Sequence, residues 1–66
     1  MSVKITYSNT EQAQYALTFI EAVQKVEAVL GFKVSNFVKT KKDFDKFGRF
    51  GFQRNGVLAW VTKDSR

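Results

Sequence analysis

The sequence contains no cysteine and no histidine. Without cysteine there is no disulfide and no thiolate metal site, and without histidine as well, zinc and copper sites are nearly excluded. A nucleophile activated by a neighbouring histidine is also impossible. The glutamates lie along one predicted helix and the aspartates in a predicted loop and tail, and no glycine-rich phosphate loop is present. We therefore expect a protein that is not an enzyme and that uses no cofactor and no metal ion.

Long apolar segments are also missing. No apolar run approaches the roughly 20 residues of a membrane span. The N-terminal residues show no apolar core of a signal peptide. These features predict a cytoplasmic protein that does not associate with a membrane.

The composition is that of a small folded protein with a strong charge asymmetry. Of its 66 residues, 44% are apolar and 15% aromatic, so residues 1–66 are expected to form a single domain. Residues 1–32 carry two lysines against three glutamates, a net charge of −1, whereas residues 33–66 carry nine basic residues against three aspartates, a net charge of +6. This concentration of positive charge in the second half favours a polyanionic partner.

The first half of the chain predicts one strand and one helix. Residues 3–8 alternate between apolar and polar side chains and are rich in β-branched residues, which indicates a strand with Val3, Ile5 and Tyr7 buried. Residues 10–30 follow a helical period, with Gly31 as the residue that ends the helix. Two helix-start signals compete, Ser8 with Glu11 and Asn9 with Gln12.

The second half predicts three strands. Residues 32–40 indicate a strand in which either Val34 and Val38 face the helix and Phe37 faces out, or a bulge near Ser35-Asn36 turns Phe37 inward. Residues 41–46 indicate a charged connection. Asn55-Gly56 between two β-rich runs is the strongest short signal for a hairpin with a two-residue turn. That turn pairs Phe52 with Ala59 and Gly51 with Trp60, because a two-residue loop fixes the register.

The expected fold is therefore α+β, with one amphipathic helix packed on one face of a three- to four-stranded antiparallel sheet in the order β-α-β-β-β. The predicted core contains apolar residues from every element: Val3, Ile5, Phe19, Ile20, Val23, Val26, Leu30, Val34, Phe50, Phe52, Ala59 and Val61.

A single helix covers only one face of such a sheet, so the other face should be open. The hairpin register places Arg49, Leu58 and Trp60 on that outer face, with Phe47 one step further along. Aromatic side chains beside cations on a sheet are typical of surfaces that bind nucleic acid, single strands more readily than duplexes. The expected phosphate contacts are the nearby basic residues Lys39, Lys41, Lys42, Arg54 and Lys63.

Two alternatives remain open at the level of sequence. The same face could dock on an acidic surface of another protein, as a regulator or inhibitor of the kind that phages and mobile elements encode, or could pair with a second copy in a homodimer. Alternatively, Trp60 and Phe47 could be buried against residues 41–46 or the C-terminal tail. Asp43 and Asp45 could suggest a metal site, but ion pairs with the neighbouring lysines are the simpler explanation.

Overall fold

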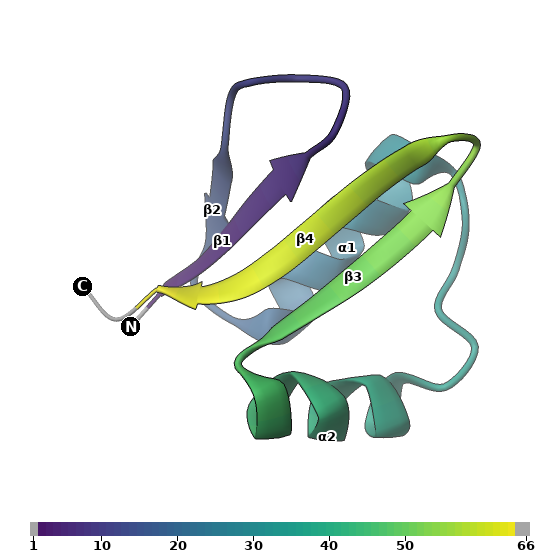
Figure 1. The fold of residues 1–66 in the computed structure, drawn as a ribbon. Helices are drawn as coiled ribbons and strands as arrows, with labels where there is room; N and C mark the ends of the chain where they lie inside the picture. Colours follow the sequence, from purple (N-terminus) through teal and green to yellow (C-terminus); the bar gives the residue numbers. More distant parts are fainter. Residues whose placement is uncertain (1, 65–66) are drawn as a thin grey trace.

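The computed structural model describes residues 2–64 and contains a four-stranded antiparallel sheet with two helices (Figure 1). The strands are β1 (Ser2–Tyr7), β2 (Gln14–Ala16), β3 (Arg49–Arg54) and β4 (Val57–Asp64), arranged in the order β2-β1-β4-β3. Helix α1 (Phe19–Leu30) lies behind the sheet, and helix α2 (Phe37–Phe47) lies beside the end at which β3 begins. The α+β class predicted from the sequence is confirmed, although the order of elements differs. Within residues 2–64, no helix is long and apolar enough to cross a membrane.

Helix α1 is shorter than the predicted helix over residues 10–30. It begins after Thr18, whose extended backbone and side-chain oxygen, accepting from the Glu21 N–H at 3.2 Å, form an N-cap. Gly31 ends the helix at φ 75°. The residues before Thr18 instead form β2, where Ala16 pairs with Val3 of β1. Ala16 fits the helical pattern of the sequence, but it is buried as part of the sheet.

The predicted strand over residues 32–40 and the predicted connection over residues 41–46 are both wrong, because most of this segment forms α2. Asn36 caps the helix by accepting from the Lys39 N–H at 3.1 Å, and Gly48 ends it at φ 76°. Phe37 and Phe44 lie seven residues apart on the inner side, where both rings contact Phe19 of α1. The stability of this lysine-rich helix therefore depends on the packing of these two rings against α1.

The hairpin is confirmed in its turn and in its register. Asn55 and Gly56 both have positive φ, at 54° and 77°, as a type I′ turn requires. Phe52 pairs with Ala59 and Gly51 with Trp60, as the sequence predicts.

Gly56→Val should destabilise the hairpin, because a β-branched side chain at φ 77° is strained. We expect a loss of about 1–2 kcal/mol in the free energy of unfolding, measured by chemical denaturation. Asn55→Gly is the control and should change stability by less than about 0.5 kcal/mol, because glycine also adopts this backbone conformation. Equal effects of the two substitutions would contradict a type I′ turn.

The core lies between α1 and the sheet and extends to α2. Most of the predicted core residues are buried, and Tyr7 is buried as expected for the inner face of β1. Ile20 was assigned wrongly, since it is 54% exposed at the flank of α1, while Val34 and Phe50 are only partly buried. Phe44 joins the core because its segment is a helix and not a loop.

Candidate binding face of the sheet

The sheet face opposite α1 carries the candidate site, and we call it the open face. Its side chains alternate with the buried ones along each strand, and the pairing of the strands brings together Lys4, Thr6, Tyr15, Arg49, Gly51, Gln53, Leu58, Trp60 and Thr62. Helix α1 is on the far side and α2 is at one end of the sheet (Figure 1), so neither helix covers this face.

Trp60 occupies the middle of the open face. It pairs with Thr6 on one side and with Gly51 on the other. A Cβ atom placed on Gly51 would lie 3.1 Å from the Trp60 Cζ3 atom, so the indole rests directly on the glycine backbone. The Arg49 guanidinium carbon lies 5.1 Å from the indole centroid, within the range of a cation–π contact. These two neighbours fix the ring while leaving Trp60 38% exposed.

A second row of side chains crosses all four strands beside Trp60. Tyr15 pairs with Lys4, Lys4 with Thr62, and Thr62 with Arg49. Tyr15 is 49% exposed, and both Lys4 and Arg49 are exposed. Asp64 is the acidic residue at the end of this face, where it pairs with Ser2. The open face thus combines two aromatic rings with two cations.

Sequence reasoning missed Tyr15 and Lys4. The alternation of residues 3–8 already turns Lys4 away from the buried Val3 and Ile5. Tyr15 carried no such signal, because its segment fits a helical period and only the pairing of β2 with β1 turns the ring outward.

The structure divides the predicted site residues among three places. Arg49, Leu58 and Trp60 lie on the open face, as predicted. Arg54 and Lys63 lie on the helix side, where the Arg54 guanidinium is 5.7 Å from the Phe32 ring and the Lys63 ammonium is 5.5 Å from the Phe44 ring. The remaining predicted residues are all on α2: Lys39, Lys41, Lys42 and Phe47.

Phe47 was placed wrongly on the outer strand, because the helix continues through it and β3 begins only at Arg49. It is 66% exposed, with the Lys46 ammonium 5.2 Å from its ring. Residues 41–46 do not cover Trp60, because they belong to α2 at the end of the sheet. The other predicted cover, the C-terminal tail at residues 65–66, lies outside the described residues.

Helix α2 presents a row of cations to solvent, which we call the lysine ridge. Lys39, Lys42 and Lys46 follow the spacing i, i+3, i+7, which places them along one side of the helix, and all three are exposed. Within residues 2–64, none of the three forms an ion pair. The ridge therefore offers its full charge to an anion.

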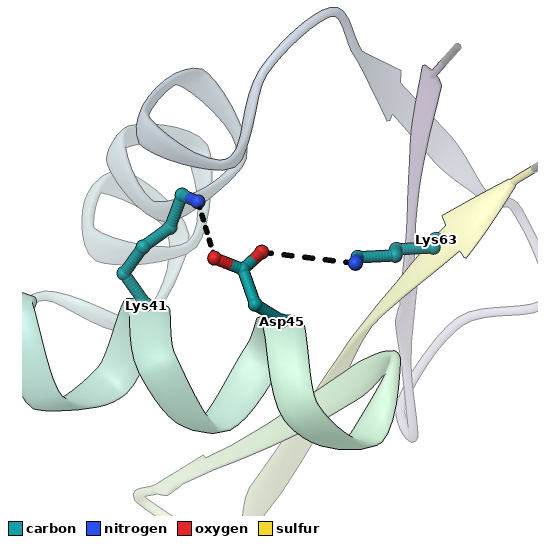
Figure 2. A network of polar contacts seen from close by, with 3 residues as sticks. All are labelled: Lys41, Asp45 and Lys63. Carbon is teal, nitrogen blue, oxygen red and sulfur yellow. Dashed lines mark hydrogen bonds and ion pairs between the residues drawn. The ribbon is translucent and has the colours of Figure 1, made fainter.

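Lys41 differs from the ridge because it is neutralised by Asp45. Its ammonium lies 2.7 Å from Asp45 Oδ2, while the Lys63 ammonium lies 3.7 Å from Asp45 Oδ1 (Figure 2). The hydrogen bond from Lys41, together with the attraction of both lysines, lowers the pKa of the Asp45 carboxyl below its usual value. For Asp45, the prediction of ion pairing with neighbouring lysines is confirmed.

Gly51→Val should displace the Trp60 indole, because the branched side chain would occupy the space in which the ring now lies. We expect a larger quenching constant of Trp60 fluorescence with acrylamide and a loss of about 0.5–1.5 kcal/mol in the free energy of unfolding. Gln53→Val, on the same strand and face, is the control and should leave quenching unchanged. Unchanged quenching in Gly51→Val would show that the glycine does not position the indole.

Comparisons with protein-family models, with curated proteins and with solved structures gave no match to this chain.

Proposed function

We propose that this protein is a non-catalytic binding protein that takes single-stranded nucleic acid on the open face. The observation that carries the proposal is the placement of Trp60 and Tyr15, both partly exposed, beside Lys4 and Arg49 on a sheet face without a helix. Aromatic rings on a sheet stack with unpaired bases, and the neighbouring cations neutralise phosphates.

A single strand suits this surface better than a duplex. Stacking on a side chain requires a base whose face is free, and the bases of a duplex are already stacked on one another. The open face is a sheet surface and not a projecting helix or ribbon that could enter a major groove.

The lysine ridge lies on α2, the helix beside the end of the sheet at which β3 begins. Helix α2 ends at Phe47, two residues before Arg49, so the ridge approaches the start of β3. Lys4 and Arg49 together with the ridge provide five cations for phosphate groups. A strand that stacks on Trp60 could therefore pass along α2.

The salt dependence of binding tests this proposal. With about five phosphates neutralised on a single strand, the logarithm of the association constant should fall against the logarithm of salt concentration with a slope of roughly −3 to −4. Quenching of the only tryptophan, Trp60, by unlabelled oligonucleotides measures binding and reports directly on the open face. A slope near zero, or binding that leaves the fluorescence unchanged, would contradict the proposal.

An acidic protein partner on the same face is the second candidate function. Gly51 and Arg49 cover part of the indole, which reduces the area available to a base but suits the Trp and Arg anchors common at protein interfaces. A pull-down from nuclease-treated lysate tests this candidate. One stoichiometric partner that is lost with Trp60→Ala would favour it, and loss of all partners after nuclease would contradict it.

A homodimer through this face would appear as a concentration-dependent mass in sedimentation.

A further inference from the structure

A cavity of about 270 Å³ lies on the helix side of the sheet, between the start of α1, the side of α2 and the ends of β1 and β4. It is separate from the open face, because Val3 and Lys63, which line it, point to the opposite side of the sheet from Trp60. The open face and the lysine ridge do not use its residues.

The inner wall of this cavity is apolar. The rings of Phe19 and Phe44 stack at a centroid distance of 4.4 Å, and both are buried, as is Val3. Leu17 also lines the cavity, at its open side, where it is 78% exposed. The volume is slightly below the roughly 300–1,000 Å³ of pockets for drug-sized ligands, so it suits a single ring or a short aliphatic chain.

At the rim of the cavity, two lysines share one aspartate, so the positive charges outnumber the negative charges. Lys41 and Lys63 share the single carboxylate of Asp45, which leaves a net charge of +1 (Figure 2). The Lys63 ammonium is 3.7 Å from Asp45 Oδ1, which is an ion-pair distance but too long for a hydrogen bond, so among residues 2–64 its N–H donors have no hydrogen-bonded acceptor. The contact of the same ammonium with the Phe44 ring places these donors beside the apolar wall.

We propose that this cavity binds a small carboxylate with an apolar body, whose carboxylate accepts hydrogen bonds from Lys63. One added negative charge makes the group of Lys41, Asp45 and Lys63 neutral. A phosphate dianion would leave an excess of negative charge beside Asp45, and a cation would be repelled by the lysines. The apolar body would cover Phe19, Phe44 and Leu17.

Titrations followed by ¹H–¹⁵N NMR test the proposal with three probes: 3-phenylpropionate, its neutral amide 3-phenylpropanamide, and inorganic phosphate. We expect the carboxylate to bind with a roughly millimolar dissociation constant and to shift the amide signals of Thr18, Phe19 and Lys63. The neutral amide should bind at least about 10-fold more weakly, because it lacks the charge-assisted hydrogen bond. Equal affinity of the carboxylate and the amide, or tighter binding of phosphate, would overturn the proposal.

Variants separate the contributions of the rim and the wall. Lys63→Met should weaken binding of 3-phenylpropionate by roughly 10-fold or more, and Leu17→Ala should weaken it by a few fold. Asp45→Asn should strengthen binding, because it removes the carboxylate that competes for both lysines. Lys33→Met, an exposed lysine away from the cavity, is the control and should bind as the parent protein does.

Unchanged binding in both Lys63→Met and Asp45→Asn would show that the rim does not recognise the carboxylate.

This inference is independent of the proposed nucleic-acid binding. Trp60→Ala should leave carboxylate binding unchanged, so failure of one proposal can be told apart from failure of the other.

Discussion

Phe44→Ala should bring the domain close to unfolding, with a loss of about 3–5 kcal/mol in the free energy of unfolding. The Phe44 side chain is 3% exposed and stacks on Phe19, so its removal leaves a cavity between the two helices. A chain of this length has a total stability of about 3–10 kcal/mol, so a single substitution can consume most of it. Urea denaturation followed by circular dichroism measures the change.

Phe47→Ala provides the matched control, because it removes the same side chain from the same helix, three residues further on. Phe47 is 66% exposed, and its loss should change stability by no more than about 0.5 kcal/mol. A difference of less than about 1 kcal/mol between the two variants would show that α2 is not packed on α1. The same result would remove the inner wall of the proposed carboxylate cavity.

Trp60→Ala should weaken binding of single-stranded nucleic acid by about 1–3 kcal/mol, roughly 5- to 150-fold, while the domain stays folded. The indole lies on the open face and not in the core, so its removal opens no cavity under α1. Fluorescence anisotropy of a labelled oligonucleotide measures the affinity, and circular dichroism verifies the fold.

Two further variants test whether the loss of affinity comes from the aromatic ring of Trp60. Trp60→Phe should recover most of the affinity, because a phenyl ring can still stack with a base. Leu58→Ala, on the same strand and face, should have a smaller effect, because it removes no aromatic ring. If Trp60→Ala unfolds the domain, the residue is part of the core and the open face loses its central contact.

The hairpin and the end of α1 could be predicted because single residues determine them. Asn55-Gly56 sets both the turn and the strand register, and Gly31 ends the helix where the apolar period stops. Helix α2 could not be predicted in the same way. Its two inward phenylalanines are separated by lysines and aspartates, and the contact that stabilises them is with Phe19, far away in the sequence.

Only the part of the candidate site that lies on the β3–β4 hairpin could be predicted from the sequence. Trp60 and Arg49 follow from the turn, whereas Tyr15 depends on a three-residue strand that sequence periodicity assigns to a helix. Lys63 is two residues after the buried Val61, and Arg54 is two residues after the buried Phe52. Strict alternation along each strand therefore places both basic side chains on the helix side. The cavity joins residues from four elements and left no local pattern in the sequence.

The strand order has a consequence for how the protein reaches its native state. The two central strands, β1 and β4, are the ones farthest apart along the chain, yet Ser2 pairs with Asp64 and Ile5 with Val61. Pairing them requires closing a loop of nearly the whole chain, which slows folding relative to proteins with local contacts. During synthesis on the ribosome, the middle of the sheet can therefore form only after β4 has emerged, and until then the edge of β1 that pairs with β4 has no strand beside it.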